Sequence, residues 1–288
     1  MEKYGEVKKG RVRDFGQLRY AMRSVFMHAN PYVRNFIVVV SSKQTQTPSW
    51  LNTTHPRVRV VEHKEIWDNT TNLPSMNSHA IEWATMNIPD LSPQYLYLND
   101  DFAITKKLDL ATIWRGPNKY ILWEAWQAPR SRHQVGDAYG KALAFVRTLY
   151  DKKYRRVISR RVGSHIPMLF DRAVMQKIKD DFPKEFKQMY NQKPFRTTFD
   201  MQFQFAYQQY IKHHYKFKMA PEPHVHFSNI SEDYEKNKKV FDGIHNKTLQ
   251  YMCLQDDFKH LPSKKVLDQI RGFYNDMFPI KGPWEKSY

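Results

Sequence analysis

Two adjacent carboxylates follow a short apolar segment in the first half of the chain. Residues 95–98 read YLYL and lead directly into Asn99, Asp100 and Asp101. Mg²⁺ takes oxygen ligands and typically uses one or two protein carboxylates, while water and substrate phosphate complete its octahedron. Adjacent acids at the end of a strand supply such a set, so Asp100 and Asp101 are candidate metal ligands. A solvated turn or a helix cap is the alternative for the dipeptide alone.

A second pair of acids repeats this arrangement later in the chain. Asp256 and Asp257 come directly after the apolar stretch that begins at Tyr251 and includes Leu254. Two such pairs in one chain favour the metal hypothesis more than either pair alone.

His165 is the candidate general base. It precedes Ile166 and Pro167 and lies between a basic, loop-like segment and a helix that Asp171 is placed to cap. An imidazole with an unperturbed pKa of about 6.5 has a neutral form at pH 7 that can accept a proton from an alcohol. Because the chain contains 12 His, a structural or surface role is the alternative.

Arg196 is the candidate phosphate ligand. It stands four residues before Asp200, at the start of an aromatic-rich helical segment. A guanidinium is well shaped to bind phosphate through two parallel hydrogen bonds, and the acid can orient it. The alternative is an ordinary surface ion pair.

Alternating helices and strands position these groups. Apolar spacing predicts, in order, a helix at 16–28, strands at 36–40 and 57–63, a helix at 77–86 and a strand at 95–98. Ser75 or Asn77 is placed to cap the second helix. Such alternation implies parallel strands with helices on the sheet faces, where ligands bind at the carboxyl ends of strands. Asp100 and Asp101 stand at such an end.

The second half of the chain has more helical patterns. Helices are expected at 137–150, 172–181, 199–213 and 263–277. The expected fold is therefore α/β, with a Rossmann-like parallel or mixed sheet, flanking helices and a helical C-terminal annex. We expect one domain over residues 1–288, with a loose internal boundary near 102–136, where Gly and Pro interrupt the pattern.

Composition narrows the class of protein. With 288 residues and 41% hydrophobic residues, the chain can bury one generous core, and its net charge of +17 favours an anionic partner. Lys and Arg are spread along the chain, which disfavours a dedicated nucleic-acid tail. No apolar run is long enough to predict a membrane span. The motifs of phosphate-loop ATPases, dinucleotide oxidoreductases and serine hydrolases are absent from the sequence.

Taken in order, these segments resemble the Stealth family of sugar-phosphate transferases. The resemblance is carried by residues 13–20, 23–24, 48–52, 63–66, 73–82 and 99–101 for the second conserved region, 165–167, 195–196 and 200 for the third, and 253–257, 278–279 and 283–285 for the fourth. The regions span 13–101, 160–210 and 250–288.

The sequence departs from the family pattern in three places. The first conserved region has no counterpart in this sequence, which starts just before the second. Gln17 stands where the family usually has Glu, and Gln255 where it usually has Asn. Each change keeps part of the hydrogen-bonding capacity and alters charge or reach.

The resemblance implies transfer of a sugar 1-phosphate from a nucleotide diphosphate sugar, such as a UDP-sugar, to a hydroxyl of an acceptor glycan. The cofactor implied is Mg²⁺ or Mn²⁺, and the product is a phosphodiester. The implied site comprises His165, Asp100, Asp101 and Arg196 as catalytic residues, Asp100, Asp101 and Asp257 as metal ligands, and Arg19, Arg23, Asn77, Ser78, Glu82, Asp200, Asp256 and Asp257 as substrate contacts.

Two other functions stay open from the sequence. One is a metal-dependent glycosyltransferase that moves the sugar alone, and the other is an inactive remnant that binds sugar or phosphate. A nucleic-acid partner is not expected, and a homodimer is compatible with the sequence. The resemblance implies the Golgi or secretory lumen for a eukaryotic member and the cytoplasm for a bacterial one.

Overall fold

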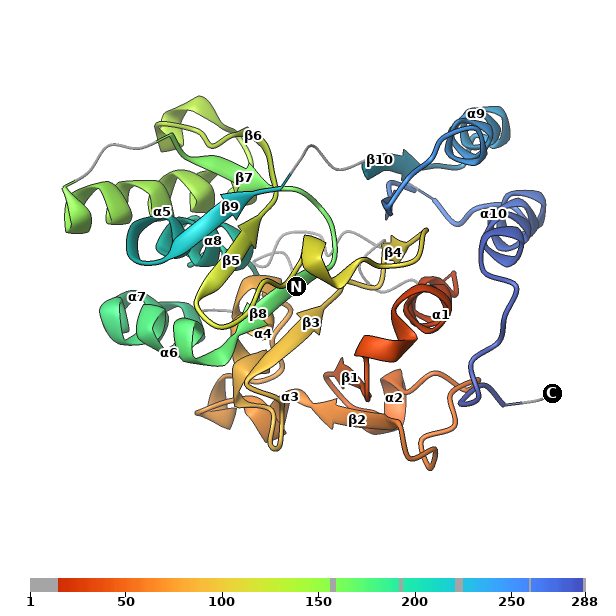
Figure 1. Cartoon of the computed structure of the whole chain (residues 1–288), viewed down its shortest axis with the longest axis horizontal. Helices are drawn as coiled ribbons and strands as arrows, with labels where there is room; N and C mark the ends of the chain where they lie inside the picture. The colour runs from red at the N-terminus through yellow and green to blue at the C-terminus, as the bar shows by residue number, and fades with distance from the viewer. Residues whose placement is uncertain (1–14, 156–158, 192–193, 221–224, 259, 287–288) are drawn as a thin grey trace.

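Small groups of paired strands, flanked by helices, make up the fold (Figure 1). The computed structural model describes residues 15–155, 159–191, 194–220, 225–258 and 260–286. The strands are β1 (Phe36–Val40), β2 (Val58–Glu62), β3 (Gln94–Tyr97), β4 (Phe102–Ile104), β5 (Lys119–Leu122), β6 (Glu124–Gln127), β7 (Arg161–Gly163), β8 (Met168–Asp171), β9 (Lys216–Met219), β10 (Val225–Ile230) and β11 (Tyr251–Asp256). The α-helices are α1 (Gln17–Ala29), α2 (Lys43–Gln46), α3 (His63–Ile66), α4 (Ser78–Ala84), α5 (Ala138–Tyr154), α6 (Arg172–Asp181), α7 (Pro183–Asn191), α8 (Phe203–His214), α9 (Tyr234–His245) and α10 (Lys264–Met277).

The strand pairing is mixed. β1 runs parallel to β2, β5 to β9 and β10 to β11. The pairs β3 with β8, β6 with β7 and β11 with β4 are antiparallel. The predicted α/β class is thus confirmed, with antiparallel pairs beside the parallel ones.

The main hydrophobic core fixes α4 in place. Trp83 of this helix is fully buried, and its ring meets the edges of Phe186 and Phe203 at centroid distances of 4.8 and 5.1 Å. Its indole N–H donates a hydrogen bond to the backbone oxygen of Met201 at 2.7 Å. The edge-to-face ring contacts and the hydrogen bond of the indole N–H together fix the orientation of Trp83. The neighbouring residue Glu82 is therefore held in position.

A second hydrophobic cluster gathers at the C-terminal side. Figure 1 shows α9 and α10 on one side of the molecule and α5 to α8 on the other. Phe241 of α9 stacks on Phe273 of α10 at 4.2 Å, and Leu254 of β11 belongs to the same cluster. The helical C-terminal annex is confirmed, and it also contains the strands β10 and β11.

Element boundaries agree well with the sequence pattern where burial alternates cleanly. The strand expected at 36–40 is β1, and the helix expected at 172–181 is α6, capped by Asp171. The fourth helix starts from Asn77, whose side chain accepts from the N–H of His79. The sequence analysis missed strands such as β9, in which lysine and apolar residues alternate but all four residues are exposed. No described helix has the length and hydrophobicity needed to cross a bilayer.

Candidate functional site

The acidic pair lies where the sequence predicted, directly after β3. Asp101 accepts a hydrogen bond from the thiol of Cys253 on its Oδ2 at 3.3 Å. Its Oδ1 is buried and has no hydrogen-bond partner among the described residues. Burial and the charge of Asp100 raise the pKa of Asp101 to about 7. Because burial disfavours the ionised form of this carboxylate, a bound cation would stabilise that form strongly.

The second acidic pair lies at the same end of a sheet. β4 is antiparallel to β11, and the N–H of Leu254 donates to the backbone oxygen of Asp101 at 3.2 Å. The start of β4 and the end of β11 therefore lie together, which brings Asp256 and Asp257 to the edge that carries Asp101. Asp256 is the last residue of β11 and accepts from the N–H of Phe258 at 2.8 Å.

The two pairs do not form a closed metal cage. Within the described part of the chain, no three His, Cys, Asp or Glu side chains are arranged to hold one ion together. The unpartnered oxygen of Asp101 beside Asp100 still fits Mg²⁺ or Mn²⁺, because such sites take as few as one or two protein carboxylates and leave the rest to water and phosphate. Asp100 and Asp101 are the residues that would hold the ion.

Glu82 faces the acidic pair from α4. Its charge contributes to the raised pKa of Asp101 and to that of Tyr97. Glu82 Oε2 lies 3.7 Å from Nδ1 of His79, which is longer than a hydrogen bond. Both ring nitrogens of His79 and this carboxylate oxygen are buried without a partner among the described atoms.

His79 is a polar group for which the sequence predicted no role. It is 1% exposed, and its ring lies 5.9 Å from that of Tyr139. The signal that could have identified it is the spacing of three residues to Glu82, which places both side chains on one face of a helix.

His165 is half-buried between two aromatic rings. Its imidazole lies 6.0 Å from the ring of Phe102 and 5.1 Å from that of Phe227. Burial lowers the pKa of His165 below its usual 6.5, while Glu82 raises it and Arg196 lowers it. The structure thus brings the predicted base within electrostatic range of both residues, and it keeps the imidazole neutral at pH 7.

Residues 194–200 dock on the start of α4. Arg196 donates from Nε to Oγ of Ser78 at 2.7 Å. Asp200 is fully buried and accepts from Nδ2 of Asn77 at 2.9 Å and from the N–H of Thr197 at 2.8 Å. The side chains of Asp200 and Asn77 therefore join two elements of the site.

Arg23 is engaged within the protein. It makes two hydrogen bonds of 2.7 Å to the carboxylate of Glu285 and one of 3.1 Å to the backbone oxygen of Phe278. Arg19 lies 3.7 Å from the same carboxylate and stacks over Trp50 at 4.9 Å. These contacts tie α1 to the C-terminal segment and occupy the Arg23 guanidinium. Arg13 and Asp14, which the resemblance places in the second conserved region, lie outside the described residues.

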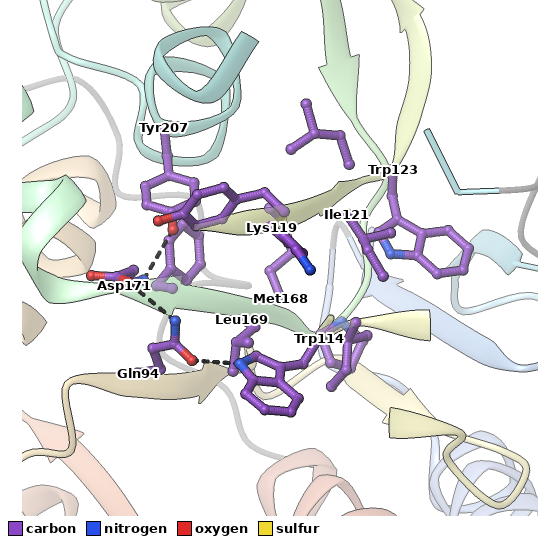
Figure 2. Close-up of a pocket in the computed structure, with 14 residues that line it drawn as sticks. Gln94, Trp114, Lys119, Ile121, Trp123, Met168, Leu169, Asp171 and Tyr207 are labelled. Carbon is purple, nitrogen blue, oxygen red and sulfur yellow. Dashed lines mark hydrogen bonds between the residues drawn. The ribbon is translucent and has the colours of Figure 1, made fainter. Parts of the chain in front are cut away.

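A groove leads to the acidic pair. It has a volume of about 1060 Å³, lies between β1 and β3, and its lining includes Glu82, Asn99 and Asp100. A much smaller cavity of about 20 Å³ is lined mainly by β5 and β8. In Figure 2, Trp114 donates to Gln94 at 2.9 Å, Gln94 to Asp171 at 3.1 Å, and the Asp171 N–H to Tyr207 at 3.0 Å. That cavity holds a single water at most, so of the two the groove is the one large enough for a substrate.

Comparison with known proteins places these residues in a family. Two family models match: Stealth protein CR2, conserved region 2, over residues 11–120, and Stealth protein CR3, conserved region 3, over residues 164–213. The first contains the segment with the acidic pair and α4, and the second contains His165, Arg196 and Asp200.

Several curated proteins are similar over much of the chain. A Streptomyces coelicolor protein named exopolysaccharide phosphotransferase is 34% identical over 94% of this chain and 45% of its own length. A Nocardia farcinica protein of that name is 25% identical over 98% of this chain and 55% of its own. The Mus musculus N-acetylglucosamine-1-phosphotransferase subunits alpha/beta are 39% identical over 121 residues, 41% of this chain and 10% of that protein.

The chain spans about half the length of the bacterial relatives it matches. Its resemblance to Stealth proteins, predicted from the order of short motifs, is confirmed by the two matched regions. The chain belongs to the Stealth protein family.

Proposed function

We propose that this chain carries the catalytic groups of a sugar-1-phosphate transferase. In the proposed reaction, a hydroxyl of an acceptor glycan attacks the sugar-linked phosphorus of a nucleotide diphosphate sugar. The bond from that phosphorus to the bridging oxygen breaks, nucleoside monophosphate leaves, and a sugar phosphodiester forms. The names of the relatives support phosphotransfer, and the choice of a UDP-sugar as donor follows from the family resemblance.

One observation carries the proposal: Glu82 lies within electrostatic range of both Asp101 and His165, and His165 is also within range of Arg196, although these residues come from distant segments. A base, a guanidinium and acids with an unpartnered oxygen are groups that phosphoryl transfer can use, because this chemistry depends on positioning and on neutralising charge. A structural ion-pair network would pair its acids, whereas Asp101 and Glu82 each keep a buried oxygen without a partner among the described atoms.

His165 has the properties of the base in this reaction. Its lowered pKa keeps Nδ1 or Nε2 able to accept the proton of the attacking hydroxyl at pH 7. The rings of Phe102 and Phe227 restrict its orientation. The proton therefore moves from the acceptor oxygen to the imidazole as the new phosphorus–oxygen bond forms.

Arg196 is assigned to the diphosphate. Its Nε is held by Ser78, and this bond fixes the plane of the guanidinium. Arginine in such a fixed plane can bind two phosphate oxygens at once. Asp100 and Asp101 would hold Mg²⁺ or Mn²⁺, which when bound would neutralise the charge of the diphosphate.

Product analysis tests the proposal. The protein is incubated with a panel of nucleotide sugars, acceptor oligosaccharide and MgCl₂, and the products are identified by mass spectrometry. We expect an acceptor that has gained one sugar phosphate, together with nucleoside monophosphate.

The other outcomes identify the alternatives. Release of nucleoside diphosphate, with an acceptor that has gained sugar alone, would show a glycosyltransferase. Calorimetric binding of the nucleotide sugar with no product would show a binding remnant. A matched reaction with the Asp101→Asn variant reports any activity from a contaminant.

A further inference from the structure

Three exposed lysines lie side by side on the β5–β9 pair. The two strands are parallel, Lys119 of β5 is paired with Lys216 of β9, and Lys218 follows on the same strand. Paired residues share a face of a sheet, and so do residues two apart on one strand. The three side chains therefore project from one face, with spacings of ~4.8 Å across the pair and ~6.6 Å along β9. We call Lys119, Lys216 and Lys218 the lysine triad.

No described acidic side chain neutralises the lysine triad. None of its ammonium groups forms an ion pair with the described part of the chain. Lys212 of the neighbouring helix α8 differs, because it lies 2.6 Å from the carboxylate of Glu124. Like charges side by side on paired strands repel each other and weaken the pair. A bound anion would remove this repulsion, so the arrangement favours an anionic ligand.

Trp114 adds a flat ring beside the lysine triad. It is 38% exposed, and it lines the same small cavity as Lys119. Its indole N–H donates to Gln94 Oε1 at 2.9 Å, and Gln94 in turn donates to Asp171 at 3.1 Å (Figure 2). These hydrogen bonds fix the indole while part of its ring stays exposed. A fixed aromatic ring of this kind is a surface on which a sugar ring can pack.

Strand β5 connects the lysine triad to the candidate site. It leads from Lys119 to Trp123, whose backbone oxygen accepts a hydrogen bond from the N–H of Ser164 at 3.1 Å. Ser164 directly precedes His165. Four residues of extended chain cover about 13 Å. A glycan of several sugars can span this distance, with one part at the lysine triad and its end at His165.

The apolar side chains of β9 lie on the face opposite to its lysines. Phe217 and Met219 are 40% and 39% exposed and alternate with Lys216 and Lys218. Phe217 is paired with Tyr120, whose hydroxyl is buried, so this face is the one nearer the protein body. Attachment to a membrane surface would need basic and apolar side chains arranged to meet the bilayer together. Their separation favours a soluble anionic ligand over a membrane.

We propose that the lysine triad and Trp114 form a subsite for an acceptor glycan that carries phosphodiesters. This inference rests on the proposed transfer reaction, and it names the class of acceptor as a chain to which sugar phosphates have already been added. The ammonium groups bind phosphodiester oxygens, and the indole packs against a sugar ring. The terminal hydroxyl of the glycan then reaches His165. Lys216 and Lys218 lie outside the matched family regions, 11–120 and 164–213, so those regions do not imply the subsite.

Calorimetric titration of the purified protein, without donor, tests the proposal. The probe is an oligomer of N-acetylglucosamine joined by phosphodiesters, and its neutral control is a chito-oligosaccharide with the same number of sugars. The phosphodiester oligomer is expected to bind about tenfold or more tightly than the neutral one, because each contact between an ammonium group and a phosphate is charge-assisted. Added KCl should reduce this difference, since salt screens exposed charges.

A matched pair of triple variants assigns the difference to the lysine triad. Replacing all three lysines of the triad by Gln is expected to abolish the preference for the phosphodiester oligomer. The control replaces Lys184, Lys187 and Lys236, exposed lysines of α7 and α9, by Gln. It removes the same number of positive charges and is expected to keep the preference. Trp114→Ala should weaken binding of both oligomers, because packing on a sugar ring does not depend on charge.

Equal affinities of the two triple variants for the phosphodiester oligomer would overturn the proposal. It is also overturned if the triad variant keeps the oligomer but loses binding to phosphatidylglycerol vesicles or to oligouridylate, since the surface would then serve a membrane or a nucleic acid. Binding through the lysine triad without any transfer product would contradict the proposed function and still support the subsite. Transfer with no effect of the triad on oligomer binding would contradict the subsite alone.

Discussion

At the residue scale, the candidate site contains several buried polar atoms without partners. Asp101 Oδ1, Glu82 Oε2 and both ring nitrogens of His79 lack hydrogen bonds among the described atoms. Leaving such a group unsatisfied costs about 1–3 kcal/mol. Four such atoms on residues of one site are therefore expected to gain partners from ligand, ion or water.

Asp101→Asn is expected to reduce transfer at least 100-fold, because the neutral amide cannot balance the charge of a bound cation. The fold should persist, since the pKa of Asp101 of about 7 shows that ionisation, not neutrality, is disfavoured at this position. Steady-state rates and circular dichroism measure the two effects. Asp109→Asn changes an exposed helix cap elsewhere and is the matched control. Wild-type rates in Asp101→Asn would refute the metal assignment.

His165→Gln is expected to lower kcat by about 100-fold, the usual contribution of a positioned base. Because burial lowers the pKa of His165, wild-type kcat/KM should rise with pH to a plateau whose midpoint lies below the usual 6.5. The rising limb should disappear in the variant. A pH series of initial rates measures both, and a variant that changes only the KM for the acceptor would reject the role of base.

At the residue scale, the sequence indicated which residue types could carry the chemistry, but it said least about their hydrogen-bond partners. It predicted Asp100, Asp101 and His165 from their chemistry and from strand ends. It could not show that Asn77 binds Asp200, since that contact joins residues 123 positions apart. Distances of this kind depend on how elements pack, and no local pattern encodes them.

At the scale of elements, α1 is fastened to the C-terminal segment by one buried carboxylate. Burial alone would raise the pKa of Glu285, but the hydrogen bonds from Arg23 and Gly282 and the charges of Arg23 and Arg19 lower it below the usual 4.5. A lowered pKa in the folded state means that the ionised form stabilises the fold at neutral pH. That contribution is lost as pH falls from about 4.5 through the folded-state value.

Glu285→Gln is therefore expected to lower the free energy of unfolding at pH 7 by about 3 kcal/mol, because the Arg23 charge stays buried without its counter-charge. The difference from the wild type should shrink below pH 4.5 as the native carboxylate gains a proton. Urea unfolding at several pH values measures it. Glu235→Gln, on the exposed first turn of α9, should show no such difference. A loss that is constant with pH would contradict the assignment.

Elements with strong periodicity were predictable, and those held by distant pairing were not. β1 and α6 match their patterns because burial alternates cleanly along them. β6 and β9 are short and mostly exposed, so only their pairing with β7 and β5 makes them strands. The antiparallel pairing of β3 with β8 joins segments about 75 residues apart, which alternation alone does not predict.

At the scale of the whole molecule, the charge of +17 is expected to influence donor binding. A basic protein attracts an anionic nucleotide sugar, and added salt screens that attraction. We expect the KM for the donor to rise several-fold with added KCl, whereas the KM for a neutral acceptor glycan should stay nearly constant. Initial rates at increasing KCl measure both. A donor KM that does not respond to salt would show that the net charge serves another purpose.

The contact between Arg23 and Glu285 also governs how the molecule can be assembled during translation. Its partners are 262 positions apart, and Arg23 leaves the ribosome long before Glu285 is synthesised. Segments that emerge first generally begin folding first, but this helix lacks its buried counter-charge until Glu285 has emerged. In nascent chains that stall or terminate before Glu285, α1 should therefore remain incompletely packed and accessible to chaperones.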